Sequence, residues 1–295
     1  MFYSDNEFRS KDFIEHEIHC EYDTYVEKRA KKKKPSPLQL SKQNHWNKVK
    51  NCRRTIQNNF GPGDLWCTFA YKKGTRKTMR EFMRDVQRFQ NHLRFEYKKR
   101  GYDIKWIRRL EIGKRGGLHA HFIINSIGDT QLISDTWKKC VKDGGRVYFT
   151  DIDDGDGYNG LAEYICKEPD EEIQGQMSFI IEKKKLCSIS TSRNLKRPEP
   201  VKKKISPWKV MKILTGREEL RPTEGFYIEK DTIFYAFNKF THMPYIRYRE
   251  KRIDNSVKTD SNSGVRIKDP ETRVMDRVKE KAKGFLRSIT DRWKR

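Results

Sequence analysis

The sequence GLHAHFIIN, residues 117–125, has the pattern of a short apolar β-strand that carries two histidines. Alternate side chains of a strand share a face, so His119 and His121 emerge side by side while the apolar residues between them pack behind. Two neighbouring imidazoles suit one metal ion. The alternative interpretation is a pair of solvated histidines on a sheet surface.

The segment before these histidines predicts a partner strand. Residues 105–112 (KWIRRLEI) are rich in bulky apolar side chains, and residues 113–117 (GKRGG) have the composition of a turn between antiparallel strands. In such a hairpin Glu111 lies near the turn and close to His119. We therefore predict that Glu111, His119 and His121 share one ion, and this mixed donor set suits Mn²⁺ or Mg²⁺, with imidazole favouring Mn²⁺.

Two further motifs flank the hairpin in sequence. LWCTFAYKKG (residues 65–74) comes before it and AEYICKEP (residues 162–169) follows. In this order the three motifs resemble those of HUH endonucleases, specifically the replication initiators of rolling-circle plasmids and single-stranded DNA phages. The resemblance spans roughly residues 65–200. It implies a ferredoxin-like (RRM-like) palm, metal-dependent DNA nicking and origin DNA as the substrate.

The composition favours a polyanionic partner. The 295 residues carry a net charge of +24, and 35 aromatic residues are interspersed among the Lys and Arg, as in grooves that track phosphates and stack unpaired bases. The six cysteines form no CxxC pair, so we expect reduced thiols rather than a zinc ribbon or disulfides. With neither a signal sequence nor a membrane span in the sequence, we expect a cytoplasmic protein, in a bacterial host.

The order of expected elements predicts an α+β fold. A strand at residues 65–71, a long helix at 75–100, the hairpin, a helix at 130–142 and a strand at 144–152 indicate an antiparallel sheet with flanking helices. We predict three parts: a basic N-terminal extension (1–60), the endonuclease domain with a C-terminal core extension (61–249), and a basic tail, partly disordered or helical (250–295).

Two features of the expected extension have bland interpretations. The basic cluster at residues 28–37 is taken as a solvated linker or a non-specific phosphate contact, with a nuclear localisation signal as the alternative. His16 and His19 are interpreted as surface residues, because nothing nearby in the sequence has the spacing of metal ligands.

A short helix is expected at residues 159–167, where Tyr164, Lys167 and Glu168 share a face. A neighbouring cation favours the phenolate of a tyrosine, which is otherwise a poor nucleophile. By resemblance Tyr164 matches the catalytic tyrosine of the family's YxxK pattern. Glu168 stands where some phage members have a second tyrosine, so it either activates water at termination or is a solvated charge. Tyr158 ranks as a poor second nucleophile.

The expected reaction is transesterification at an origin. Tyr164 attacks a scissile phosphate polarised by the metal ion, which gives a 5′-phosphotyrosyl link and a free 3′-hydroxyl. Arg193, Lys196 and Arg197 are expected to contact phosphates, unless they are ordinary loop charges. The sequence contains no GxxxxGK[ST] phosphate loop, so a host helicase and a DNA polymerase are the expected partners.

Two other functions fit parts of this pattern. A non-enzymatic nucleic-acid-binding protein on a ferredoxin-like sheet explains the charge and the aromatic residues, but not the order of histidines, glutamate and tyrosine. A relaxase or single-strand transposase of the same type is the second alternative. Relaxases commonly place the tyrosine before the histidines, whereas here it follows them, and the transposases are usually shorter.

Overall fold

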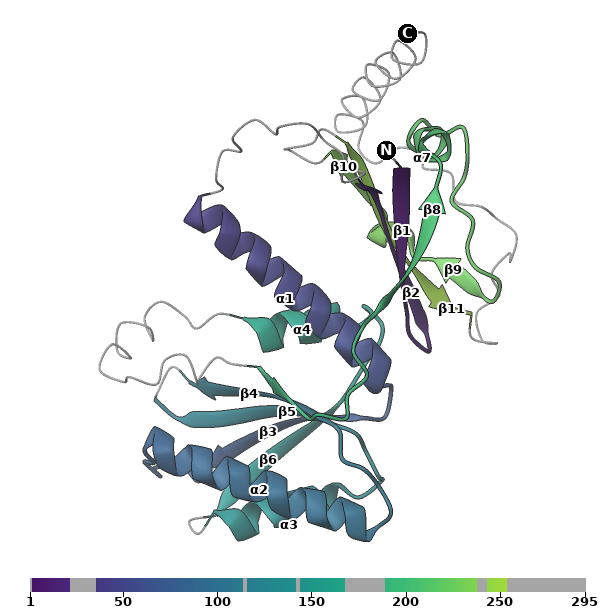
Figure 1. The fold of residues 1–295 in the computed structure, drawn as a ribbon. Helices are drawn as coiled ribbons and strands as arrows, with labels where there is room; N and C mark the ends of the chain where they lie inside the picture. The colour runs from purple at the N-terminus through teal and green to yellow at the C-terminus, as the bar shows by residue number, and fades with distance from the viewer. Residues whose placement is uncertain are drawn as a thin grey trace. The chain divides into compact units, whose positions relative to one another are not determined.

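The structure is a computed structural model that describes residues 2–21, 36–113, 116–141, 144–167, 189–237 and 243–253. The chain forms two compact units (Figure 1). One comprises Pro35–Arg197, and the other combines Met1–Lys34 with Pro198–Arg295. The first unit contains every residue of the three motifs that the structure describes.

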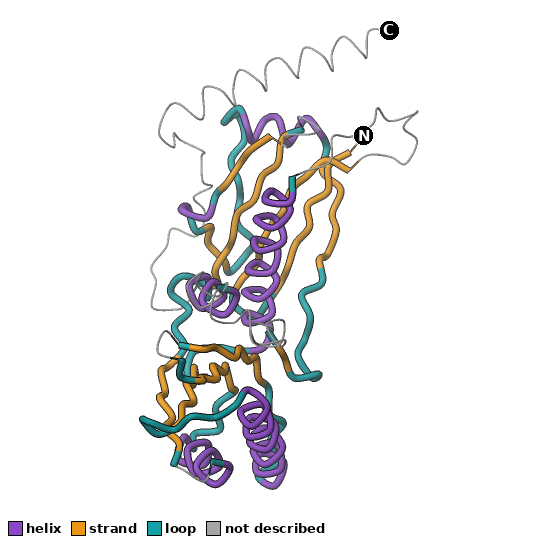
Figure 2. Tube along the Cα trace, turned by 90° about the vertical axis from the view of Figure 1, so that its left-hand side faces the viewer, coloured by secondary structure: helices purple, strands orange, loops and turns teal. Residues whose placement is uncertain are grey.

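A five-stranded antiparallel sheet forms the centre of the Pro35–Arg197 unit, with the strand order β6-β3-β5-β4-β7. Its strands are β3 (Leu65–Tyr71), β4 (Trp106–Ile112), β5 (Leu118–Ile124), β6 (Gly145–Asp151) and β7 (Ser190–Thr191). Helices cover both faces of the sheet: α2 (Met79–Lys99) and α3 (Thr130–Cys140) on one, α1 (Pro37–Asn59) and α4 (Asn159–Cys166) on the other. Figure 2 shows the same layers from the side.

The long helix α2 is fixed at both ends by its sequence. Thr78 and Glu81 form a capping box, in which the Thr78 hydroxyl accepts from the Glu81 N–H and the Glu81 carboxylate accepts from the Thr78 N–H. Gly101 follows the helix with a φ of 81°, a conformation that favours glycine. The apolar stripe of α2 packs with α3 against alternate residues of the sheet, including Phe69 and Phe122.

The second unit is built on another antiparallel sheet, of order β10-β11-β2-β1-β8, with β9 paired to β11. Its elements are β1 (Phe2–Arg9), β2 (Phe13–Glu21), β8 (Pro200–Ile205), α7 (Pro207–Leu214), β9 (Phe226–Ile228), η2 (Lys230–Thr232), β10 (Phe234–Phe237) and β11 (Pro244–Arg252). The buried face of α7, with Val210 and Leu214, packs in a core with Ile18 and Ile246 of the sheet.

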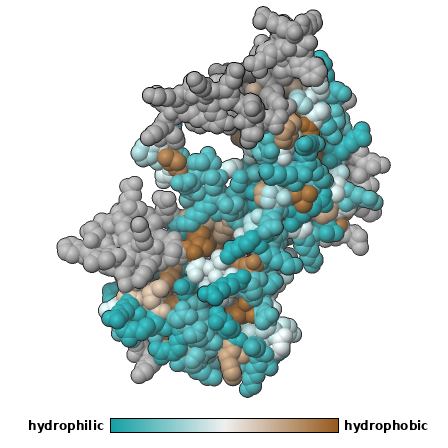
Figure 3. All heavy atoms as spheres, in the orientation of Figure 1, coloured by the Kyte–Doolittle hydropathy of each residue, from teal (hydrophilic) through white to brown (hydrophobic). Residues whose placement is uncertain are grey.

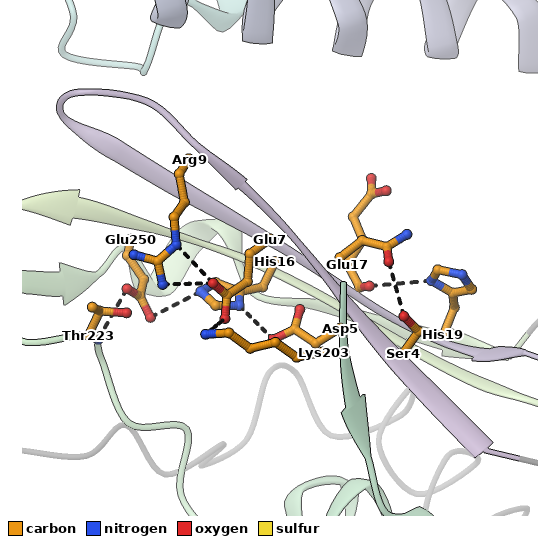
Figure 4. A network of polar contacts seen from close by, with 11 residues as sticks. Ser4, Asp5, Glu7, Arg9, His16, Glu17, His19, Lys203, Thr223 and Glu250 are labelled. Carbon is orange, nitrogen blue, oxygen red and sulfur yellow. Dashed lines mark hydrogen bonds and ion pairs between the residues drawn. The ribbon is translucent and has the colours of Figure 1, made fainter. Parts of the chain in front are cut away.

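A buried polar network runs through this second sheet (Figure 4). His16 is only 4% exposed; its Nδ1 lies 2.8 Å from the Asp5 carboxylate and its Nε2 lies 3.4 Å from that of Glu250. Burial lowers the pKa of His16, but the hydrogen bonds to Asp5 and Glu250 outweigh it and raise the pKa to about 9. His16 is therefore an imidazolium that joins three strands at neutral pH.

The expected α+β architecture with an antiparallel sheet and flanking helices is confirmed. The expected division at residues 60 and 249 differs from the structure, which places β1 and β2 with the C-terminal strands and α1 with the central unit. His16 and His19 lie on β2, and the surface interpretation is wrong for His16, which is buried. Nearly all of the basic cluster, residues 28–35, and residues 254–295 lie outside the described residues.

The described surface has the polarity expected from the composition. Most of the described atoms on the face shown in Figure 3 belong to hydrophilic residues, in keeping with 65 Lys and Arg in the chain. Within the described ranges, no helix has the length and apolarity needed to cross a membrane.

Candidate active site

The register of three strands brings the predicted ligands onto one face of the central sheet. His121 of β5 pairs with Thr68 of β3 on one side and with Arg109 of β4 on the other. His119 pairs with Glu111, so the two side chains that the hairpin prediction placed close together are direct cross-strand neighbours. Cross-strand partners project to the same side, here the side covered by α1 and α4.

The His121 imidazole is held from three directions. Its Nε2 lies 3.0 Å from a Glu111 carboxylate oxygen, and its Nδ1 lies 3.1 Å from the Thr68 hydroxyl. The Trp66 ring stacks on it, with centroids 5.4 Å apart and planes 7° apart. A separation of 3.0 Å matches two adjacent ligands at about 2.1 Å from one ion, so His121 and Glu111 fit a metal centre.

His119 adopts a different orientation from His121. The two ring centroids are 6.5 Å apart, and the His119 ring packs over the turn. A Cβ added at Gly113 would lie 3.2 Å from its Cε1, and one at Gly117 would lie 3.5 Å from its Nε2. Burial, followed by the neighbouring His121, lowers the pKa of His119, which favours the neutral form that binds metals. His119 must therefore turn toward Glu111 to complete a three-ligand centre.

A second group of possible ligands lies in the other unit. Among the described residues, the three-residue group of His, Asp and Glu whose ligand atoms lie within 4.8 Å of one another is Asp5, Glu7 and His16, all buried. These side chains already have ionic partners: Asp5 is bonded to His16, and Glu7 pairs with Arg9 and Lys203 (Figure 4). The buried negative charge of this group is thus balanced by side-chain cations.

Tyr164 on α4 lies directly over the histidine and glutamate pair. Its ring meets those of His121 and Trp66 edge to face, with centroids 5.4 Å and 5.6 Å away, and it remains 45% exposed. Burial raises the pKa of the Tyr164 phenol and the Glu111 carboxylate adds to this, whereas Arg109 and Lys167 lower it. The structure therefore assembles the expected tyrosine, lysine and ligands around one exposed hydroxyl.

The sequence interpretation missed Arg109, which connects α4 to the sheet. Arg109 is 2% exposed, and its Nη1 donates to the backbone carbonyl of Tyr164 at 2.6 Å and to that of Ile165 at 3.2 Å. Carbonyls at the end of a helix lack partners within the helix, so a buried guanidinium satisfies them. The doublet Arg108 and Arg109 within an apolar strand was the available signal, because one of two successive residues must face inward.

The opposite end of α4 is fixed to α1. Arg53 Nη1 donates to the Asn159 side chain at 3.3 Å, and Gln57 Nε2 donates to the Gly157 carbonyl at 3.0 Å. Tyr158 precedes α4 with a φ of 65° and is buried. Its ranking as a poor second nucleophile agrees with this burial.

Other predicted site residues lie elsewhere or are not described. Arg193, Lys196 and Arg197 are exposed in the loop after β7. This loop is held to α1, because the backbone N–H and carbonyl of Lys196 both bond to the Asn59 amide at 2.8 Å. Glu168 lies outside the described residues, so its role stays a prediction.

Comparisons with known proteins agree with this arrangement. Residues 64–169 match the model of a family of viral and plasmid type described as "Replication-associated protein". A solved structure, the N-terminal nuclease domain of non-structural protein 1 of minute virus of mice, is similar at 7% identity over 61% of this chain and 85% of that chain. Its TM-score of 0.22 is too low to carry an argument. No curated protein matches the chain.

The matched residues include all the side chains assembled above. They contain β3, the β4–β5 hairpin and α4, and therefore Glu111, His119, His121 and Tyr164. The family match confirms the resemblance that the three motifs carry. Residues 64–169 are thus the replication-associated domain of a rolling-circle Rep.

Proposed function

We propose that this protein nicks one strand of single-stranded origin DNA by tyrosine transesterification and so starts rolling-circle replication. What carries this proposal is the position of Tyr164, whose exposed ring lies 5.4 Å from His121, itself 3.0 Å from Glu111. The Tyr164 hydroxyl oxygen attacks the scissile phosphorus, the bond from phosphorus to the 3′-oxygen breaks, and the protein becomes linked to a 5′-phosphate. The leaving oxygen takes up a proton and becomes a free 3′-hydroxyl.

The ligand residues set the electrostatics of the reaction. Glu111, His119 and His121 would hold a divalent ion, Mn²⁺ or Mg²⁺ by their donor types, which when bound stabilises negative charge on the phosphate oxygens. Thr68 and Trp66 fix the His121 ring, so its Nε2 stays directed at Glu111. Arg109 and Lys167 favour the ionised forms of both Glu111 and Tyr164.

The phenol proton has a defined first acceptor. The Glu111 carboxylate contacts the Tyr164 hydroxyl as a hydrogen-bond partner, and hydrogen bonding to His121, its largest influence, lowers the pKa of Glu111. Glu111 is therefore ionised at neutral pH and can accept the proton as the oxygen attacks. Lys167, the residue that ends α4, contributes a positive charge that stabilises the phenolate.

The steps outside the nick belong to the same proposal. The free 3′-hydroxyl primes a DNA polymerase, and a host helicase unwinds the strand ahead of it. Arg193, Lys196 and Arg197 are exposed and suited to contact flanking phosphates, and Glu168 would activate the water that releases the protein. We place these steps in the cytoplasm of a bacterial host.

The first experiment is adduct capture on the full chain. The protein is incubated with Mn²⁺ and a library of single-stranded DNA, and its peptides are analysed by mass spectrometry for a 5′-phosphonucleotide. We expect an adduct on Tyr164, its loss in Tyr164→Phe, and its retention in Tyr102→Phe, an exposed tyrosine after α2. Tight DNA binding without an adduct in any metal would favour the non-enzymatic nucleic-acid-binding function instead.

A further inference from the structure

The face of the sheet that carries His121 continues onto the edge strand β6. Tyr148 of β6 pairs with Thr68 of β3, which in turn pairs with His121 of β5. The three residues therefore form one row across the sheet, with Tyr148 two strands, or about 10 Å, from His121. Thr68, a small residue, is the member of β3 between them.

The alternation of β6 separates its two faces clearly. Val147 and Phe149 pack against the core formed with α2 and α3. Arg146 and Tyr148 alternate with them and so face the side of His121, where both are exposed, Tyr148 by 57%. A strand that buries one aromatic ring and exposes another two strands from the candidate active site offers that second ring to a ligand.

Basic residues lie at the same end of this row. Arg146 pairs with Ala70, which also pairs with His119, so a guanidinium and the outer histidine share the next row. The Lys72 N–H donates to the Gly144 carbonyl at 3.1 Å, which places the exposed residues Lys72 and Lys73 beside the start of β6. An aromatic ring beside cations is the composition that binds single-stranded nucleic acid, because any base can stack and any phosphate can pair.

We propose that Arg146 and Tyr148 form a nucleotide subsite next to the nicking centre, in which an unpaired base stacks on Tyr148 and its phosphate pairs with Arg146. This subsite rests on the proposed function, because it guides the substrate strand toward Tyr164. The rows fix its position relative to His121, so the stacked nucleotide belongs to the sequence flanking the scissile phosphate. A duplex keeps its bases stacked inside, so the subsite selects single-stranded DNA.

Equilibrium binding of single-stranded DNA tests the subsite without relying on catalysis. The affinity of the full chain for a labelled single-stranded oligonucleotide and for the matching duplex is measured by fluorescence anisotropy. We expect Tyr148→Ala to weaken single-strand binding about tenfold, or ~1.4 kcal/mol, and Tyr148→Phe to bind as the wild type does. Tyr102→Ala, an exposed tyrosine after α2, is the matched control, and duplex binding should change little.

Two further measurements locate the contacts. In Arg146→Ala the slope of log affinity against log salt should become shallower by about 0.7, the value for one phosphate contact on a single strand. A series of oligonucleotides with one abasic site should contain a position at which wild type and Tyr148→Ala bind equally, because the stacked base is missing there. That position identifies the nucleotide.

The outcomes separate this subsite from the proposed function. If Tyr148→Ala binds single strands as tightly as the wild type while the wild type forms the Tyr164 adduct, the subsite is refuted and nicking stands. If no adduct forms but Tyr148→Ala loses affinity, the subsite stands and nicking fails. A drop in the thermal midpoint of Tyr148→Ala would assign the loss of affinity to folding, and the Tyr148→Phe and abasic data would then decide.

Discussion

Replacing Arg109 should uncouple the tyrosine helix from the sheet. Arg109 is 2% exposed, and its Nη1 holds the carbonyls of Tyr164 and Ile165 at 2.6 and 3.2 Å. Arg109→Met keeps most of the side-chain volume but removes the donors and the charge. The end of α4 then has two carbonyls without their present partner, and Tyr164 loses its fixed position over Glu111.

The magnitude follows from the bonds that are lost. A hydrogen bond from a charged donor contributes about 1.5–3 kcal/mol, so we expect the free energy of unfolding to fall by about that amount. Catalysis is more sensitive than stability, since a displacement of about 1 Å at a reacting group costs ~10²-fold in rate. The charge of Arg109 also lowers the pKa of Tyr164, so its loss moves the phenol further from ionisation.

Arg108→Met provides a matched control on the same strand. Arg108 faces the opposite side of the sheet, where it bonds to Gln90 and lies 5.6 Å from the Trp106 ring. We expect both variants to lose stability, measured by chemical denaturation, but single-turnover nicking to slow about 10²-fold only in Arg109→Met. Hydrogen exchange gives a readout independent of activity, because α4 amides should lose protection in Arg109→Met alone. Equal nicking rates and equal α4 protection in the two variants would refute the positioning role.

Three other perturbations test separate parts of the structure. Thr68→Val removes the hydroxyl 3.1 Å from His121 Nδ1 and should weaken Mn²⁺ binding about tenfold or more in calorimetry; unchanged affinity would contradict the orienting role. His16, with a pKa raised to about 9 from 6.5, adds stability in full below pH 6.5 and loses it as pH rises through 9. Between these pH values, denaturation should show on the order of 2–3 kcal/mol lost relative to His16→Gln, whose stability should not follow this titration. Gly145→Ala would place its Cβ 2.2 Å from Trp137 Nε1, so we expect a thermal midpoint several degrees lower, unless α3 shifts without cost.

The central sheet could be predicted because its local patterns agree with its packing. β3 and β5 have an apolar face toward α2 and α3, and the glycines at Gly113 and Gly117 mark the turn between β4 and β5. The N-terminal strands could not, since β1 and β2 bury charged residues such as His16. Polar composition indicates exposure unless opposite charges meet, and the partners of β2 come from β11, more than 200 residues later in the sequence.

The candidate site divides along the same physical boundary. The alternation within residues 117–125 and the turn place His119, His121 and Glu111 on one face without any distant information. The role of Arg109 could not be predicted, because it depends on contacts with α4 more than 50 residues away. A shift of one residue in the register of β4 would exchange Arg108 and Arg109 between the two faces of the sheet.

The charges around Tyr164 link the nucleophile to the ligand centre. Burial and the negative charge of Glu111 raise the pKa of the phenol, so the resting protein keeps its nucleophile protonated. Arg109 and Lys167 oppose this shift, but both charges are fixed parts of the fold. The variable contribution is the charge of Glu111, and any cation that neutralises this carboxylate favours the phenolate. Because Glu111 is both a predicted ligand and the hydrogen-bond partner of Tyr164, cation binding and nucleophile activation are coupled through one side chain.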